Sequence, residues 1–101
     1  MWLMVMFDLP VTSKDERKRA TAFRKSLLDM GFQMSQYSVY MRFCSAGSQI
    51  ETLSSAIGGL VPEAGKVSVL SFTDKQYQRT INYAGTTRSE NHQAPGQLEL
   101  L

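Results

Sequence analysis

A run of seven apolar residues, Met1 to Phe7, opens the chain and is stopped by Asp8, Leu9 and Pro10. A run of this length that ends in a charge and a proline is typical of a buried strand. Asp8 would then lie at the carboxyl end of that strand, held by the sheet and open to solvent. Asp8 is therefore the first candidate for chemistry. The alternative is that it only caps a turn with the segment around Pro10.

Length and composition indicate one small globular domain. The chain has 101 residues, of which 43% are hydrophobic and 20% are charged. A domain of this size buries a modest core, so association would stabilise it. Cys44 is the single cysteine, so an internal disulfide is excluded, and no Cys/His cluster of zinc spacing supports a structural zinc site. Cys44 itself is expected to be a buried strand residue. The apolar start is too short to span a bilayer and lacks a basic leader, so we expect a cytoplasmic protein without membrane partners.

A helix is predicted to follow the first strand. Ser13 and Glu16 have the spacing of a capping box, in which each side chain bonds a backbone amide that the first turn leaves free. Gly31 comes where a left-handed C-terminal cap is wanted. Between them runs an apolar stripe at helical spacing, Ala20, Phe23, Leu27 and Met30. This stripe is expected to face the core.

Basic residues gather on this predicted helix. Six of the eleven in the chain lie within twelve positions: Lys14, Arg17, Lys18, Arg19, Arg24 and Lys25. Their spacings near three, four and seven place most of them opposite the apolar stripe, where phosphates could bind. A solvated face without a partner is the alternative, because such faces are common.

Two strands and a second helix are expected next. Between residues 32 and 43 apolar side chains occupy every second position, as in a strand. The apolar positions change from even to odd numbers near residue 35, which indicates two short strands with a tight break. Ser48 and Glu51 repeat the capping pattern and predict the start of a helix. Gly58 and Gly59 would end it.

The order of elements predicts an α+β, ferredoxin-like βαββαβ fold with an additional C-terminal strand. Residues 66–73, rich in valine and leucine, would form the fourth strand and residues 79–84 the additional one. A turn or short helix is expected at residues 74–78. In this fold the helices pack on one face of an antiparallel sheet.

The domain is predicted to cover residues 1–84, and residues 85–101 form a polar tail. The tail ends in an alternating apolar stretch, Gln97 to Leu101, which suggests a strand that docks on a partner chain, or else a frayed terminus. His92 lies in the tail without a second ligand nearby, so no role is assigned to it.

Together these residues resemble a known family. Val5 to Pro10, a basic helix containing Arg17 and Lys18, and the run Gly31 to Tyr40 with its Gln-x-Ser-Val element occur in order and at fitting intervals. This combination is similar to the CRISPR-associated endoribonucleases (the Cas-two family), the small subunits of the spacer-acquisition complex. The resemblance covers roughly residues 1–84.

The resemblance implies a homodimer whose last strands are exchanged between protomers. It also implies that Asp8 is the catalytic residue and the ligand of Mg²⁺. Magnesium prefers octahedral oxygen coordination and needs only one or two protein carboxylates, so two Asp8 side chains across a dimer axis could hold one ion. The hydrolysis would act on phosphodiester bonds of RNA or DNA, and no general base is apparent in the sequence.

A second role implied by the resemblance is architectural. In this family the dimer bridges two dimers of the integrase subunit (the Cas-one family) and supports the double-stranded DNA that becomes a new spacer. Lys14, Arg17, Lys18, Arg24 and Lys25 are the predicted nucleic-acid-binding residues. Phosphate contacts of this kind give affinity without sequence reading and are strongly salt-dependent.

Other classes of protein share the predicted fold. A VapD-type ribonuclease toxin or a non-catalytic nucleic-acid-binding module would show the same order of elements. An RNA-recognition motif requires a Lys/Arg-Gly-aromatic core, which residues 38–43 lack. The basic cluster disfavours a small-molecule sensor.

Overall fold

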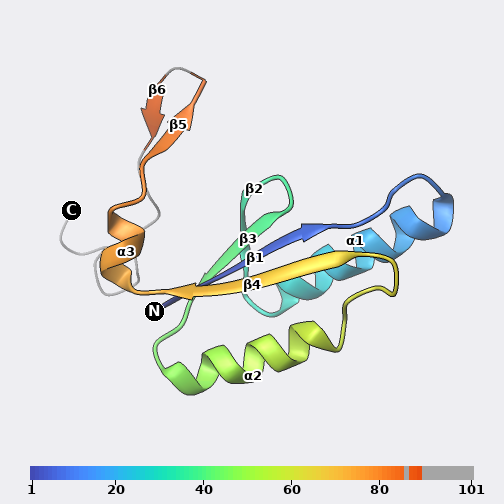
Figure 1. The fold of residues 1–101 in the computed structure, drawn as a ribbon, viewed down its shortest axis with the longest axis horizontal. Coiled ribbons are helices and arrows are strands. Elements are labelled where there is room, and N and C mark those ends of the chain that lie inside the picture. The colour runs from blue at the N-terminus through green and yellow to red at the C-terminus, as the bar shows by residue number, and fades with distance from the viewer. Residues whose placement is uncertain (86, 90–101) are drawn as a thin grey trace.

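The computed structural model describes residues 1–85 and 87–89 (Figure 1). Its elements are β1 (Trp2–Asp8), α1 (Lys14–Asp29), β2 (Gln33–Gln36), β3 (Val39–Phe43), α2 (Gly47–Gly58), β4 (Lys66–Phe72), α3 (Asp74–Gln78), β5 (Asn82–Ala84) and β6 (Thr87–Ser89). Four strands form one sheet in the order β2-β3-β1-β4, and β1 is antiparallel to both of its neighbours. This confirms the predicted α+β, ferredoxin-like βαββαβ fold.

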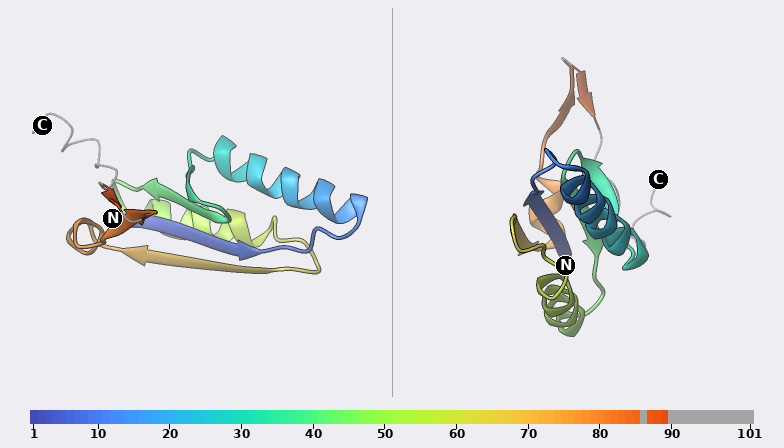
Figure 2. Two further views of the ribbon diagram at one scale, coloured as in Figure 1. Left: turned by 90° about the horizontal axis from the view of Figure 1, so that it is seen from above. Right: turned by 90° about the vertical axis from the view of Figure 1, so that its right-hand side faces the viewer.

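The central strand β1 presents two different faces because successive side chains of a strand alternate. Leu3, Val5 and Phe7 point toward α1 and α2. They meet the apolar faces of both helices in one core, which includes Phe23, Leu27, Phe32, Tyr40 and Ile57. Both helices therefore cover the same face of the sheet, as Figure 2 shows.

The other face of the sheet, named the open face, carries the even-numbered side chains of β1. Its apolar middle consists of Met4 and Met6 together with their cross-strand neighbours Val39, Met41 and Leu70. The exposed fractions of Met6 and Leu70 are 37% and 39%. Large apolar side chains thus remain in contact with water on this face.

The short helix α3 covers the open face only at the end where β1 begins. Trp2 stacks on Tyr77 of α3 with ring centroids 4.2 Å apart and meets Phe43 edge to face. The α-amino group of Met1 pairs with the carboxylate of Asp74 at 2.8 Å. These contacts form a second, smaller apolar cluster separate from the main core.

The ends of α1 are as the sequence predicts. The Ser13 hydroxyl accepts from the Glu16 amide at 3.1 Å, and the Glu16 carboxylate accepts from the Ser13 amide at 2.9 Å. After the helix, Gly31 adopts a left-handed conformation with φ +89°. A β-carbon at this position would lie 3.2 Å from Nε of Arg42.

Replacing Gly31 with alanine should therefore lower the free energy of unfolding by about 1–2 kcal/mol, the cost of a left-handed non-glycine residue. Gly58→Ala is the matched control, because nothing lies within 4 Å of the position that a β-carbon would take there and its φ is not positive. We expect that variant to be neutral or stabilised by up to about 1 kcal/mol. Urea unfolding midpoints check both values, and equal destabilisation of the two variants would contradict the argument.

The region between β2 and β3 confirms the predicted tight break. The pairing register shifts between Met34 and Gln36, and residues 37–38 form the turn. The pairing of β3 with β1 decides which of its side chains face the helices. Tyr40 is buried under the helices, whereas Val39 and Met41 lie on the open face. The apolar set of alternate side chains in β3 therefore faces away from the main core. Cys44, directly after β3, is buried as expected.

The predicted start of the second helix is wrong. The helix α2 begins at Gly47 with Ala46 as its N-cap, so Ser48 already lies inside the first turn. The side-chain oxygen of Gln49, rather than that of Glu51, accepts the free amide of Ser45 at 2.8 Å. Gln49 makes this bond because it lies three residues after the N-cap, where a side chain can reach back to the free backbone amides before the helix.

The segment after β4 differs in extent from the prediction. Residues 74–78 form the short helix α3. The strand expected at residues 79–84 is limited to β5, Asn82–Ala84, and it pairs with β6 rather than with the main sheet. In Figure 1 this hairpin extends from α3 away from the four-stranded sheet.

His92 and the stretch 97–101 lie outside the described residues. None of the described helices has the length and apolar character needed to cross a membrane.

Candidate functional site

Asp8 is the last residue of β1 and is exposed to solvent. Its side chain lies on the open face, since it shares the parity of Met4 and Met6 and stands opposite Lys66 of β4. Within the described part of the chain, no hydrogen bond or ion pair engages its carboxylate. The strand therefore fixes the position of this group and leaves its oxygens available to a ligand.

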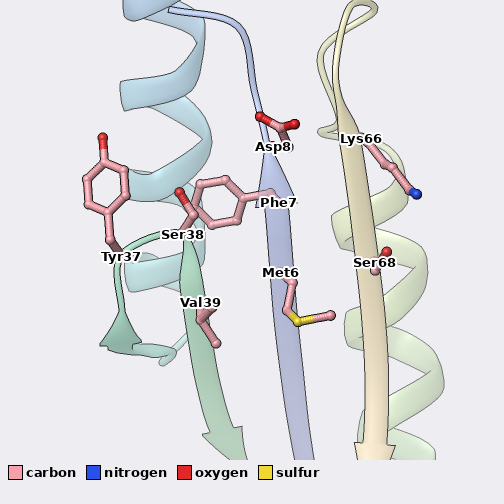
Figure 3. Close-up of a pocket in the computed structure, with 8 residues that line it drawn as sticks. All are labelled: Met6, Phe7, Asp8, Tyr37, Ser38, Val39, Lys66 and Ser68. Atoms are coloured by element: carbon pink, nitrogen blue, oxygen red, sulfur yellow. The ribbon is translucent and has the colours of Figure 1, made fainter. Parts of the chain in front are cut away.

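A pocket of about 310 Å³ surrounds this position (Figure 3). Its walls come from three places: the end of β1, the start of β4, and the turn between β2 and β3. The lining residues are Met6, Phe7, Asp8, Tyr37, Ser38, Val39, Lys66 and Ser68. In Figure 3 the Lys66 side chain extends away from Asp8, so the two opposite charges border the pocket without pairing.

The β2–β3 turn is attached to β1 immediately before Asp8. The Phe7 amide donates to the Ser38 carbonyl at 3.1 Å. Ser38 has φ +63°, a left-handed conformation that costs energy for a residue other than glycine. Such strain persists where surrounding contacts determine the backbone. Tyr37, the residue before it, is 79% exposed.

The loop that follows Asp8 is held by α1. The Glu16 carboxylate accepts from the Thr12 hydroxyl at 2.6 Å, and the Arg17 guanidinium donates to the carbonyls of Val11 and Thr12 at 3.3 and 3.4 Å. The Thr12 hydroxyl, followed by the Ser13 amide, lowers the pKa of Glu16. Protonation of Glu16 would weaken these contacts. Their contribution to folding stability is therefore present at neutral pH and is lost as the pH falls through the lowered pKa of Glu16.

The predicted nucleic-acid-binding residues are accessible along α1. Lys14, Arg17, Lys18 and Lys25 are exposed, and Arg24 is half-buried. Two of these side chains also make local contacts, because Arg17 bonds the loop carbonyls and Arg24 donates to the Thr21 hydroxyl at 3.3 Å. The exposed lysines have no such bond among the described residues.

The structure does not bring Asp8 and the basic residues together. The helix α1 packs on the face of the sheet that carries Val5 and Phe7, whereas Asp8 and its pocket lie on the open face. Within one protomer, a ligand of α1 and a ligand of Asp8 therefore occupy opposite sides of the sheet.

The donor set at Asp8 fits Mg²⁺ in a restricted sense. No group of three or more Asp, Glu, His or Cys side chains forms a metal cage in the described residues. Magnesium is nevertheless held by one or two carboxylates plus water in many sites. A free carboxylate that borders an open pocket meets that requirement, and a second carboxylate would have to come from another chain.

Sequence reasoning missed Lys66 and Tyr37 as members of this site. Lys66 is adjacent to Asp8 only through the antiparallel pairing of β1 with β4, which no local pattern reveals. Tyr37 lies in the Gln-x-Ser-Val element that contributed to the family resemblance, so that element was a usable signal.

Comparison with known proteins supports the resemblance. The family model described as CRISPR associated protein Cas2 matches residues 1–80 of this chain. The chain belongs to the Cas2 family. A relative from Paracidovorax avenae, named CRISPR-associated endoribonuclease Cas2, is 53% identical over 100 residues, which cover 99% of this chain and 93% of the relative. A relative of the same name from Parvibaculum lavamentivorans is 43% identical and covers 99% of each chain.

A solved structure of another Cas2 protein has the same fold. The crystal structure of Streptococcus pyogenes Cas2 at pH 6.5 superposes with a TM-score of 0.65 at 20% sequence identity. The match covers 84% of this chain and 100% of that chain. At this identity the likeness concerns the fold alone, and the roles of individual residues of this Cas2-family chain stay predictions.

Proposed function

We propose that this Cas2-family protein works as a homodimer that cleaves nucleic acid with magnesium at Asp8 and binds duplex DNA during spacer acquisition. The observation that carries the catalytic part is the free, strand-fixed carboxylate of Asp8 beside an open pocket. Relatives that share up to 53% of their residues with this chain are named endoribonucleases, which supports a phosphodiesterase function.

The open face supports the homodimer. Met6 and Leu70 are exposed on this face within the described structure, whereas Met41 packs against the cluster at the end that α3 occupies. A two-fold interface pairs the same patch of both copies. Because Asp8 shares this face, a second copy seated on it would bring its own Asp8 to the same interface. That arrangement would supply the two carboxylates that a monomer lacks.

The residues that would hold Mg²⁺ are Asp8 and Asp8 of the partner subunit. When bound, the ion would stabilise the charge that develops on the phosphodiester and promote deprotonation of water. The chain itself contributes the fixed carboxylates and a pocket wall that carries the cation of Lys66. With the roles of ion and protein divided in this way, hydrolysis requires no nucleophilic side chain.

The proposed activity predicts a strict requirement for a divalent ion. Purified wild-type protein should cleave single-stranded RNA or duplex DNA in Mg²⁺ and lose that cleavage in EDTA. Restored Mg²⁺ should recover it. Cleavage that persists in EDTA would contradict a metal centre at Asp8.

The bridging role is supported by a different surface. The exposed lysines of α1 lie on the side of the sheet opposite the pocket, so a duplex bound there would leave Asp8 unobstructed. An integrase dimer at each end of a Cas2-family dimer would then share one continuous DNA. The alternative of an isolated ribonuclease toxin requires no such second basic surface.

Replacing Lys18 and Lys25 with alanine should weaken duplex DNA binding. Each lost phosphate contact lowers the slope of log K against log salt by roughly 0.9, so two contacts should reduce it by about 2. Fluorescence anisotropy between about 50 and 200 mM salt measures the slope. Lys75→Ala, an exposed lysine on α3, is the control. An unchanged slope in the double variant would remove α1 as the contact surface.

A further inference from the structure

We propose that Tyr37 and Lys66 form a subsite for a single unpaired nucleotide beside Asp8. Tyr37 would stack on the base, and Lys66 would contact a phosphate of the same strand. This inference rests on the proposed function, because it names the form of substrate that the Asp8 pocket accepts. It makes Tyr37 the residue that distinguishes unpaired from paired strands.

The exposure of Tyr37 is the first observation. Its side chain is 79% exposed although it belongs to a two-residue turn between short strands, where a small polar residue is the usual choice. Figure 3 shows the ring at the side of the pocket opposite β4. The flat surface of the ring is thus available to a planar partner.

The second observation is that this turn is fixed relative to Asp8. The bond from the Phe7 amide to the Ser38 carbonyl, 3.1 Å, ties the turn to the residue directly before Asp8. The left-handed conformation of Ser38, φ +63°, sets the direction in which the chain leaves Tyr37. The backbone that carries the ring therefore has a defined position with respect to Asp8, so binding of a base need not order the turn.

Size and charge specify the occupant. In one protomer the pocket volume is about 310 Å³, at the lower limit of ligand pockets, roughly 300–1,000 Å³, so it suits one nucleotide rather than a duplex. Lys66 borders the opposite wall with its ammonium group directed away from Asp8 (Figure 3), so it offers a cation to a phosphate further along the strand. An aromatic surface, a cation and a carboxylate around one small pocket complement the base, the phosphate and a metal-bridged phosphodiester of one strand.

Stacking explains why the strand must be unpaired at this position. Both faces of a base inside a duplex are covered by its neighbours, so a protein ring can stack only on a base that has left the stack. Base stacking on an aromatic side chain is independent of sequence because every base has a π-face. The subsite would therefore select strand form rather than sequence.

The test is a binding measurement in EDTA, where no cleavage occurs. Short single-stranded RNA and DNA oligonucleotides with one 2-aminopurine report stacking through loss of fluorescence. Tyr37→Ala should raise Kd for single strands by about 5- to 150-fold and remove the quenching. Tyr37→Phe should retain both, since the ring is kept. Tyr83→Ala, another exposed tyrosine at 68%, should bind as wild type does.

Lys66→Ala tests the phosphate contact separately. It should reduce the salt slope of single-strand binding by about 0.7, whereas Lys75→Ala should leave it unchanged. Unaltered single-strand affinity and quenching in Tyr37→Ala would overturn the subsite, and so would an equal loss of affinity for single strands and for duplex DNA.

The two proposals fail in different measurements. Loss of stacking in Tyr37→Ala together with absent cleavage by the wild type would retain the subsite and reject the nuclease. Magnesium-dependent cleavage with unaltered binding of Tyr37→Ala would retain the nuclease and reject the subsite. Circular dichroism of each variant confirms the fold, which an exposed turn residue should not affect.

Discussion

Replacing Asp8 with alanine is expected to abolish magnesium-dependent cleavage, with a loss of roughly 100-fold or more. Mutation of groups that merely orient a metal ligand costs about 10- to 100-fold, and Asp8 is proposed to be the ligand itself. Its side chain is exposed and makes no hydrogen bond or ion pair within the described structure, so the fold should tolerate the change within about 0.5 kcal/mol. Cleavage of a labelled strand in Mg²⁺ measures the loss.

Two further variants make this result specific. Asp8→Asn keeps the size of the side chain and removes the charge, so it should be as inactive as Asp8→Ala. Asp29→Ala removes an exposed carboxylate at the end of α1, outside the pocket, and should cleave as wild type does. Equal cleavage by wild type and Asp8→Ala, with dimer and duplex binding retained, would reject the catalytic role and leave a bridging subunit.

The parts of this site that the sequence predicted depend on local patterns. The end of β1 at Asp8 follows from seven apolar residues and a proline, and the start of α1 follows from the reciprocal bonds of Ser13 and Glu16. Both signals lie within a few residues of the feature they determine. Pattern reasoning succeeds where the decisive contacts are close in the chain.

The parts that it did not predict depend on contacts between distant segments. Lys66 is 58 positions after Asp8 in the chain, yet pairing of β4 with β1 makes it a neighbour. The helix α1 covers the face of the sheet opposite the Asp8 side chain, although the helix follows Asp8 closely in sequence. The predicted start of α2 was wrong for a local reason: Ala46 is the N-cap, and Gln49, three residues later, accepts from the Ser45 amide in place of the predicted Ser48 and Glu51 pair.

The open face leads to the second large effect. Leu70→Glu is expected to convert the proposed dimer into monomers. Leu70 lies opposite Met4 on this face and is 39% exposed in one protomer, so a monomer can hydrate the new carboxylate. At a two-fold interface the substitution occurs twice, and each buried charge costs several kcal/mol. The Kd of the dimer should rise by at least about 1,000-fold, which is about 4 kcal/mol.

Leu60→Glu is the matched control, because Leu60 is similarly exposed at 44% but follows α2 and lies outside the sheet. Sedimentation equilibrium should show monomers for Leu70→Glu and wild-type association for Leu60→Glu. If one magnesium requires a carboxylate from each copy, Leu70→Glu should also lose cleavage while its own Asp8 is intact. Full cleavage by a monomeric Leu70→Glu would mean that a single Asp8 suffices, whereas a persistent dimer would place the interface on another surface.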